Sequence, residues 1–252
     1  MRVGKENINT LAYIPLHYGK EYLEAVIKSI HPFVDRVVAF YSSEPTYGHK
    51  GNLANPDSKE ELERIVNSFT RTEFIDITNR RITRENIHRN LAHTYASSAI
   101  QNPKDLNFDL VMAVDADEVW NPERVEEAIH AAYFSNSHFI HVAGSQWYHF
   151  WKGLKEVNRD GFYPMRFTNL NNYVGNADII EAGEIYHMGY AIDPEVMKYK
   201  LSCHGHKSEI SNGWYNDKWL NYERGVTTHL HPASRDIWIE TEDFNGKLPD
   251  YL

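Results

Sequence analysis

The chain has 252 residues and a net charge of −9 at pH 7, and 42% of its residues are hydrophobic. This length and composition suit one α/β domain, and no apolar run approaches the roughly 18 residues that a membrane span needs. The acidic balance disfavours broad nucleic-acid binding, which relies on clusters of lysine and arginine. The first residues lack the apolar core of a signal peptide and Cys203 is the single cysteine, so we expect a cytoplasmic protein without an intrachain disulfide.

The first 134 residues alternate between predicted strands and predicted helices. Short apolar runs predict strands over 8–14, ended by Pro15, and over 36–41, 73–77 and 110–114. Apolar residues at helical spacing follow each strand, and Ser58 with Glu61 forms a capping-box pattern at the start of the second helix. The inner face of the third helix is predicted to consist of Ile87, Leu91, Tyr95 and Ala99. This alternation predicts a parallel sheet with right-handed crossovers.

After residue 135 the pattern changes to short strand-like segments separated by glycine, asparagine and aspartate. These segments cover 137–150, 163–167 and 185–187. They predict a mixed sheet with loops, laid against the first half. The expected fold class is therefore α/β, with a mostly parallel central sheet flanked by helices and a mixed β/loop C-terminal half, in one domain over 1–252.

Two aspartates one residue apart follow the fourth predicted strand. Asp115 and Asp117 come directly after 110–114, and Asn121, Pro122 and Glu123 predict a helix that starts behind them. Open α/β sheets bind ligands at the carboxyl ends of their strands, and residues i and i+2 of extended chain face the same side. The pair can therefore hold one Mg²⁺ or Mn²⁺ ion shared with substrate phosphates. The alternative is a solvated acidic turn that stabilises the following helix dipole.

The segment 114–123, Val-Asp-Ala-Asp-Glu-Val-Trp-Asn-Pro-Glu, resembles the D-x-D segment of GT-A glycosyltransferases, in particular family 2 of the nucleotide-sugar transferases. Arg89-Asn90, the segment 163–167, Tyr173-Val174-Gly175 and His187-Met188-Gly189-Tyr190 are similar to further segments of that family. Lys198 and Lys200 also follow where such sequences often carry basic residues. The resemblance covers roughly residues 8–207 and implies a Rossmann-like GT-A fold, with a nucleotide-binding half over 1–134 and an acceptor-side half and tail over 135–252.

The resemblance also implies roles for individual residues. Asp115 would contact the donor ribose or the metal, while Asp117 and His187 would bind the Mn²⁺ or Mg²⁺ that bridges the donor diphosphate. For His187 the alternative is a half-buried strand histidine. The donor would lie across the strand ends, contacting Tyr13, Pro15, Tyr41, Arg89 and Arg166. For Arg89 a role as a surface helix residue stays open. Glu44 comes later than the acid that such enzymes carry near the first strands, so the identity of the nucleotide is open. UDP is expected because it is the nucleotide that the family commonly uses.

An inverting transfer needs a base that takes the proton of the acceptor hydroxyl. The resemblance puts this acid between the glycine step and His187, where Glu181 is preferred over Asp178, with Asp217 in reserve. The family's usual His-Glu pair is absent. Two His-x-His pairs are interpreted either as acceptor or diphosphate contacts or as structural residues: His204 and His206, and His229 and His231.

The expected function is a metal-dependent glycosyltransferase that moves a sugar from a nucleotide-sugar donor, UDP-linked by family habit, to an acceptor hydroxyl with inversion. The acceptor is open: a glycan, a lipid-linked sugar, a protein or a modified nucleic-acid base. One alternative is a Mg²⁺-dependent phosphatase of the haloacid-dehalogenase type, although its aspartate pair usually follows the first strand rather than the fourth. The other alternative is a carbohydrate-binding protein without catalysis.

Overall fold

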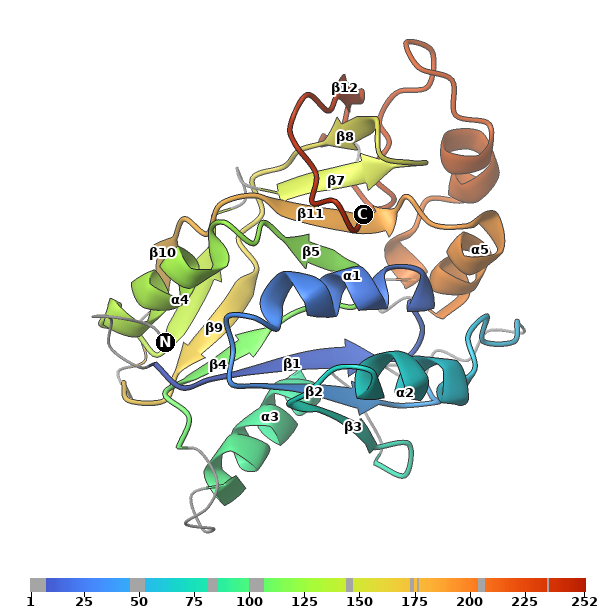
Figure 1. The fold of residues 1–252 in the computed structure, drawn as a ribbon. Helices are drawn as coiled ribbons and strands as arrows, with labels where there is room; N and C mark the ends of the chain where they lie inside the picture. The colour runs from blue at the N-terminus through green and yellow to red at the C-terminus, as the bar shows by residue number, and fades with distance from the viewer. Residues whose placement is uncertain are drawn as a thin grey trace.

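The computed structural model describes residues 8–45, 53–80, 86–99, 107–143, 147–172, 175, 177–203, 207–234 and 236–252. A seven-stranded sheet has the order β10-β6-β9-β4-β1-β2-β3. All its strands except β9 run in the same direction, so the predicted fold class of a mostly parallel sheet flanked by helices is confirmed (Figure 1). Its strands are β1 (Thr10–Leu16), β2 (Arg36–Tyr41), β3 (Thr72–Asp76), β4 (Leu110–Ala113), β6 (Phe139–Val142), β9 (Met165–Asn169) and β10 (Ala177–Ile180). The second half of the chain thus contributes three strands to the same sheet.

A second sheet of five strands has the order β12-β8-β7-β11-β5. Its strands are β5 (Glu118–Trp120), β7 (Trp147–Trp151), β8 (Glu156–Asn158), β11 (Ile185–Tyr190) and β12 (Glu242–Asp243). Strand β5 pairs antiparallel with β11, with Glu118 opposite His187. This strand was not predicted, and it brings the aspartate pair next to the segment that contains His187.

The helix behind the aspartate pair starts later than predicted. Helix α4 spans Val125–Phe134, whereas the sequence predicted a start at Pro122 with Asn121 as the cap. Asn121 instead forms a turn in which its side-chain oxygen accepts from the Glu123 backbone N–H at 3.0 Å. An asparagine before a proline suits such a turn as well as a helix cap, and the pairing of β5 with β11 decides between them.

The other helices lie on both faces of the central sheet. Helices α1 (Lys20–Ile30) and α2 (Lys59–Asn67) pack on one face, α3 (Asn86–Ala99) packs on the opposite face, and α5 (Pro194–Cys203) follows β11. Figure 1 shows α1 between the central sheet and the second sheet. The predicted capping box of Ser58 and Glu61 is present at the start of α2. Two short helices, η3 (Lys207–Glu209) and the π-helix η4 (Tyr215–Leu220), follow α5.

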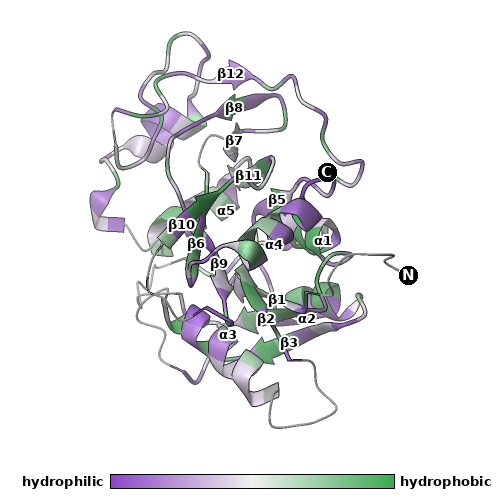
Figure 2. Ribbon diagram, turned by 90° about the vertical axis from the view of Figure 1, so that its left-hand side faces the viewer, coloured by the Kyte–Doolittle hydropathy of each residue, from purple (hydrophilic) through white to green (hydrophobic). Residues whose placement is uncertain are grey.

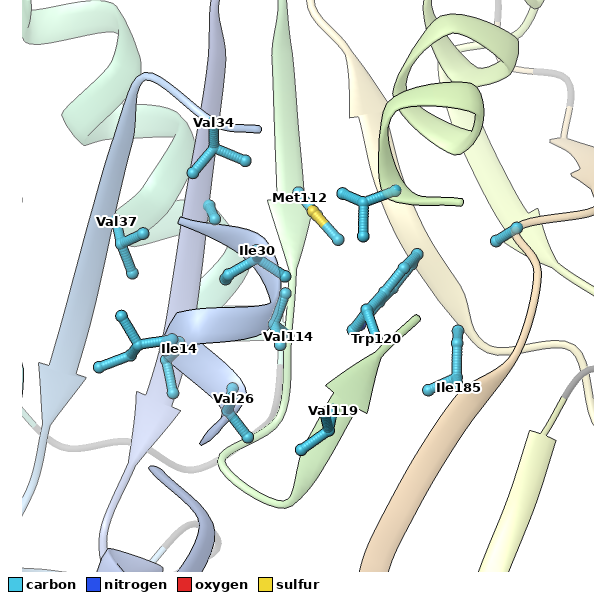
Figure 3. Close-up of a cluster of buried hydrophobic side chains, with 14 of the residues drawn as sticks. Ile14, Val26, Ile30, Val34, Val37, Met112, Val114, Val119, Trp120 and Ile185 are labelled. Atoms are coloured by element: carbon cyan, nitrogen blue, oxygen red, sulfur yellow. The ribbon is translucent and has the colours of Figure 1, made fainter. Parts of the chain in front are cut away.

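Alternation along the strands divides the core into two layers. On β1, Ile14 faces α1 while Tyr13 faces α3. Figure 3 shows Val26 and Ile30 of α1 packed between the central sheet and Trp120 of β5. In Figure 2 most strands of the central sheet are green, which marks hydrophobic residues, whereas β8 and β12 at the far edge of the second sheet are mainly purple, which marks hydrophilic residues. The position of β5 against α1 therefore depends on buried apolar contacts.

One detail of the prediction is wrong, and a second, the inner face of α3, is confirmed only in part. Pro15 does not end the first strand, because β1 continues to Leu16 with Pro15 opposite Phe40. The missing proline N–H would point towards β4, which has already ended at Ala113, so no strand hydrogen bond is lost. On α3 the buried stripe consists of His88, Ala92 and Ala96, and the predicted residues Ile87, Leu91 and Tyr95 are half-buried beside it. Within the described residues, no helix combines the length and apolar character that crossing a membrane requires.

Candidate functional site

A cleft of about 630 Å³ opens at the carboxyl ends of β1 and β4. Its walls are Pro15 and the first turn of α1, the segment Asp115–Asp117, and residues 192–196 at the start of α5. This volume lies within the range of about 300–1,000 Å³ that is typical of small-molecule sites. Both aspartates therefore lie where the sequence predicted a ligand.

The amino end of α1 already has an internal anion. The Asp57 carboxylate accepts from the backbone N–H groups of Gly19 at 2.6 Å and Lys20 at 2.9 Å. A helix amino end is a common phosphate site, but here a carboxylate occupies it. Phosphates in this cleft would consequently be held by side chains or by a cation.

Asp117 is held between a lysine and a histidine. Lys200 Nζ donates to Asp117 Oδ2 at 3.1 Å and to the Gly189 carbonyl at 3.0 Å. His187 Nε2 lies 3.7 Å from Asp117 Oδ1. Burial on its own would raise the pKa of Asp117, but the positive charge and the hydrogen bond of Lys200 outweigh it and hold the pKa below its usual range. Asp117 is therefore an anion at neutral pH.

The orientation of His187 is fixed by a neighbouring histidine and a carboxylate. His149 Nδ1 lies 3.1 Å from His187 Nδ1, and His149 Nε2 lies 3.2 Å from Asp160 Oδ2. The carboxylate favours a proton on His149 Nε2, so His149 Nδ1 accepts from the Nδ1–H of His187. Burial lowers the pKa of His187 to about 3. The ring is therefore neutral at pH 7 and its Nε2 lone pair is free for a ligand bond on the side of Asp117.

Arg166 of β9 pairs with two acids of the aspartate segment. Its Nη2 donates to Asp115 Oδ2 at 2.8 Å and to Glu118 Oε1. Burial on its own would lower the pKa of Arg166, but Glu118 and Asp115 raise it above its usual value, so the guanidinium stays charged. Burial raises the pKa of Glu118 well above its usual value even beside Arg166, so the site pairs two carboxylates, Asp115 and Asp117, with the two cations Arg166 and Lys200.

The three predicted metal ligands are brought together only in part. Asp117 and His187 approach each other, but Asp115 is paired with Arg166, and the described residues contain no group of three His, Cys, Asp or Glu that could hold a metal. Two ligand atoms of one cation with bonds of about 2.1 Å lie roughly 3 to 4.2 Å apart, and the observed 3.7 Å fits this range. A carboxylate oxygen and a neutral imidazole suit Mn²⁺, and Mg²⁺ or Mn²⁺ often completes its shell with substrate phosphates.

Gly189 leaves the space in which these groups meet. A Cβ at this position would lie 2.5 Å from both His187 Cε1 and Lys200 Nζ, and 2.8 Å from Asp117 Oδ2. Any larger residue would have to displace at least one of the three. The glycine of His-Met-Gly-Tyr is thus explained by close approach rather than by a special backbone conformation.

The predicted donor contacts fall into two groups. Tyr13 lies beside Arg89, which donates a hydrogen bond to it, and within the electrostatic influence of Asp115 and Arg166. Burial raises the pKa of Tyr13, so its hydroxyl stays protonated. Tyr41 faces the α1 layer, is 4% exposed and stacks on Phe74. Pro15 lines the cleft, whereas Tyr41 is not among its lining residues.

The candidate base residues lie apart from the aspartate pair. Asp178 on β10 accepts from the Ser135 hydroxyl at 2.9 Å, and Glu181, directly after β10, is exposed. β10 is separated from β4 by β9 and β6, and three inter-strand steps of about 4.8 Å make roughly 14 Å. Asp217 is exposed on η4. The structure does not bring these three acids into contact with Asp117.

Of the two His-x-His pairs, only His229 and His231 fall within the described residues. His204 and His206 lie outside the described residues. The ring of His231 packs edge-on against Trp238 at 4.7 Å, and its Nδ1 accepts from the Ser234 backbone N–H at 2.8 Å. These contacts give His231 a structural role in the C-terminal tail. His229, exposed, adopts a left-handed backbone with φ of 56°.

Sequence reasoning missed Glu118, His149 and Asp160 as parts of the site. Glu118 was read only as the residue after the aspartate pair, and it is 1% exposed beside Arg166. His149 lies in the segment 137–150, for which the sequence predicted only a strand, and Asp160 is one acid within a loop. A usable signal was the strand alternation that puts Trp147 and His149 on one face of β7.

His88 provides a test of burial near the site. It is 5% exposed, and burial lowers its pKa from 6.5 to about 4, with the Asp115 charge opposing. The unfolded chain therefore binds a proton below pH 6.5 that the folded chain rejects until about pH 4. The free energy of unfolding should be highest above pH 6.5 and lose up to roughly 3 kcal/mol from this group by pH 4.

Urea unfolding of wild type and His88→Gln between pH 7.5 and 4.5 measures this contribution. The variant should show a flatter pH dependence, whereas Asn90→Gln, a change at an exposed and non-titratable residue of the same helix, should keep the wild-type slope. Identical slopes in wild type and His88→Gln would contradict the assignment.

No family model matches the chain, and no curated protein matches it. Among solved structures it is similar to a 4-diphosphocytidyl-2C-methyl-D-erythritol synthase, with 11% identity and a TM-score of 0.41 over 69% of this chain and 89% of that one. It is also similar to glucosyl-3-phosphoglycerate synthase from Mycobacterium tuberculosis in complex with Mn²⁺, UDP-glucose and phosphoglyceric acid, with 10% identity and a TM-score of 0.41 over 81% and 82%. A further structure of that enzyme with Mn²⁺ and UDP-glucose gives 13% identity, a TM-score of 0.35 and coverage of 54% and 43%. Likeness at this level leaves any functional conclusion to the residues of the site.

Proposed function

We propose that the protein is a metal-dependent glycosyltransferase that takes a sugar from a nucleotide-sugar donor, UDP-linked in the first instance, to an acceptor hydroxyl with inversion. The observation that carries this proposal is the approach of Asp117 Oδ1 and the neutral His187 Nε2 to 3.7 Å, with Asp117 lining the cleft at the strand ends and His187 lining the adjoining smaller cavity. The resemblance of the aspartate segment to GT-A enzymes supports the same reading. No observation favours a phosphatase or a binding protein without catalysis.

The charge of the site explains why a cation would be needed. Asp115 and Asp117 line the cleft and are each already paired with a cation, Arg166 or Lys200, so the site has no excess positive charge for a nucleoside diphosphate. Asp117 and His187 would hold Mn²⁺ or Mg²⁺, which when bound neutralises the charge that develops on the leaving diphosphate. Lys200, already beside Asp117, adds a second positive charge at the same place. Arg166 holds the Asp115 carboxylate and Glu118 in fixed positions.

The acceptor proton requires a separate base within hydrogen-bond reach of the hydroxyl. Glu181 stays the first proposal for this base and Asp178 the second, both from the resemblance. Both lie on or directly after β10, which runs parallel to β4, so Glu181 lies at the same edge of the sheet as Asp115. The acceptor, whether a glycan, a lipid-linked sugar, a protein or a modified nucleic-acid base, would have to reach this edge.

A thermal-shift screen of nucleotides and nucleotide-sugars with and without Mn²⁺ tests the proposed function. Ligands that bind only the folded state raise its melting temperature. UDP with Mn²⁺ should raise it by more than the sum of the two separate shifts, and a matching UDP-sugar should release UDP on incubation with an acceptor. Absence of any nucleotide-dependent shift, with Mn²⁺ present, would contradict the proposal.

His187→Gln should weaken Mn²⁺ binding without abolishing it. Asp117 and the diphosphate oxygens remain as ligands, and the expected loss is at least about 10-fold, because removal of even a residue that only orients a metal ligand costs about 10- to 100-fold. Electron paramagnetic resonance of free Mn²⁺ in the presence of UDP measures the affinity. His138→Gln is the control, because the His138 ring contacts the Asn169 carbonyl at the opposite end of β9. Equal affinity in wild type and His187→Gln would remove His187 from the site.

A further inference from the structure

A smaller cavity of about 200 Å³ adjoins the cleft at Asp115, and we call it the side cavity. Asp115 lines both spaces, so they meet at this carboxylate. The remaining walls include Glu118, Trp147, Asp160, Phe162 and Arg166. His187 also lines the side cavity, which therefore lies next to the place proposed for the cation and the diphosphate.

Two buried donors of the side cavity lack partners. Trp147 is 4% exposed, and neither its Nε1–H nor the Nε–H of Arg166 has a hydrogen-bond partner among the described residues. Buried N–H groups are almost always paired in folded proteins, and an exception calls for a ligand or an ordered water. Two residues that line the side cavity thus carry unused donors, which suits a bound molecule with acceptor oxygens.

The same cavity has aromatic walls. Phe162 lines it and is 70% exposed, so its phenyl ring is available at the rim. The Trp147 ring is held in place by the Arg166 guanidinium, whose Cζ lies 5.2 Å from the ring centre. A monosaccharide ring combines apolar C–H faces, which suit such rings, with several oxygens that accept hydrogen bonds. At about 30 Å³ per water, the cavity has the volume of roughly seven waters, which suits one sugar ring rather than a nucleotide.

Charge selects among sugar rings. Asp115, Glu118 and Asp160 face the side cavity together with a single guanidinium, that of Arg166. Arg166 is already paired with Asp115 and Glu118, which leaves it little capacity for a further carboxylate. An anionic uronate would therefore be repelled, whereas a neutral ring with hydroxyl groups would not.

We propose that the side cavity binds one neutral monosaccharide ring and discriminates against uronates. This proposal rests on the proposed function only for the source of the ring, which is either the sugar of the donor or the sugar of the acceptor. Trp147 and Arg166 donate to its oxygens, Phe162 covers one apolar face, and Asp115 separates the ring from the nucleotide.

The first experiment compares UDP, UDP-glucose, UDP-galactose and UDP-glucuronate by calorimetry with Mn²⁺, in wild type and Phe162→Ala. If the ring belongs to the donor, wild type should bind a neutral UDP-hexose at least about threefold more tightly than UDP-glucuronate. Phe162→Ala should reduce that hexose affinity about three- to tenfold and leave UDP affinity unchanged. Phe134→Ala is the matched control, because Phe134 is 61% exposed on α4 and does not line the cavity.

The second experiment removes a hydrogen-bond donor of the side cavity, the indole N–H of Trp147, whereas the first removed the Phe162 ring at its rim. Trp147→Phe keeps a ring but deletes the indole N–H, and its expected effect is also a three- to tenfold loss for the sugar but not for UDP. Trp151→Phe is its control, since Trp151 lies on the same strand and has an equally unpaired indole N–H, but lines a different cavity. A loss of folding common to both variants would show in the control.

The third experiment assigns the source of the ring. Methyl glucoside and methyl glucuronide are added to protein saturated with UDP and Mn²⁺, and saturation-transfer NMR reports their binding. A signal for the neutral glycoside that is lost in Phe162→Ala, with unchanged UDP-hexose affinity, assigns the ring to the acceptor.

If UDP and Mn²⁺ fail to bind, the proposed function fails, and the glycosides added alone still test the cavity. The cavity proposal is overturned when no neutral sugar in any arm responds to Phe162→Ala and Trp147→Phe, or when the uronates bind as tightly as the neutral sugars.

Discussion

Asp117→Asn is expected to abolish Mn²⁺-dependent nucleotide binding and turnover. An amide oxygen is a neutral and much weaker ligand for Mn²⁺ than a carboxylate, and the change also removes the negative charge that faces His187 and Lys200. Release of UDP from a UDP-sugar measures turnover, and free Mn²⁺ measured by electron paramagnetic resonance reports binding. Turnover should fall below detection, with Mn²⁺ affinity in the presence of UDP reduced at least about 100-fold.

The alanine variant at the same position should also lose stability. Lys200 is only 9% exposed, and Asp117 is its carboxylate partner. Removal of one partner of a buried pair costs about 3–5 kcal/mol, although here the 24% exposure of the Asp117 side chain argues for roughly the lower end. Inactivity of Asp117→Ala alone would therefore not distinguish a lost ligand from a destabilised fold.

The double variant Asp117→Ala with Lys200→Met separates these two effects. It removes both charges, so the free energy of unfolding in urea should return towards the wild-type value while Mn²⁺ binding stays absent. Wild-type Mn²⁺ affinity in the double variant, or in Asp117→Asn, would show that Asp117 is not a metal ligand.

Gly189→Ala is expected to damage the site almost as severely. The added methyl group would lie 2.5 Å from His187 Cε1 and from Lys200 Nζ, and 2.8 Å from Asp117 Oδ2. Lys200 can move only by breaking its bonds to Asp117 and the Gly189 carbonyl, and the His187 ring is held by His149. Overpacking of this kind costs about 1–3 kcal/mol, and we expect Mn²⁺ affinity with UDP to fall more than about tenfold.

Gly161→Ala is the matched control for this substitution. A Cβ at Gly161 meets nothing within 4 Å, and neither glycine has a left-handed φ, so the two changes differ only in what the methyl group touches. Melting temperature and Mn²⁺ affinity are measured for both variants. An unchanged affinity in Gly189→Ala would mean that the meeting of Asp117, His187 and Lys200 at this glycine is not needed for binding.

The sequence was sufficient for the strands that carry their own pattern. The run Arg36–Tyr41 was predicted with its observed limits, and the strand before Asp115 was predicted with its observed start and an end one residue too late. Both are continuous apolar segments bounded by polar residues, and burial on two faces of a parallel sheet requires such segments. The cleft at the strand ends follows from this placement.

Strand β5 and the residues it positions could not be predicted in the same way. Three residues, Glu118 to Trp120, are too few to show a period, and they are extended because β11, far along the chain, pairs with them. The contacts of His149 with Asp160 and of Arg166 with Asp115 likewise join separate elements, so no spacing of residues within one segment predicts them. Tyr41 shows a related limit, because alternation tells which strand residues share a face but not which helix covers that face.

The most direct test of the metal at Asp117 and His187 is a calorimetric titration of UDP into wild type with Mn²⁺ and, separately, with a chelator. The site has no excess positive charge, because Arg166 and Lys200 are paired with Asp115 and Asp117, and it has two ligand atoms suitably spaced for one ion. We therefore predict that UDP binds at least about tenfold more tightly when Mn²⁺ is present. The same UDP affinity with and without the metal would contradict the account.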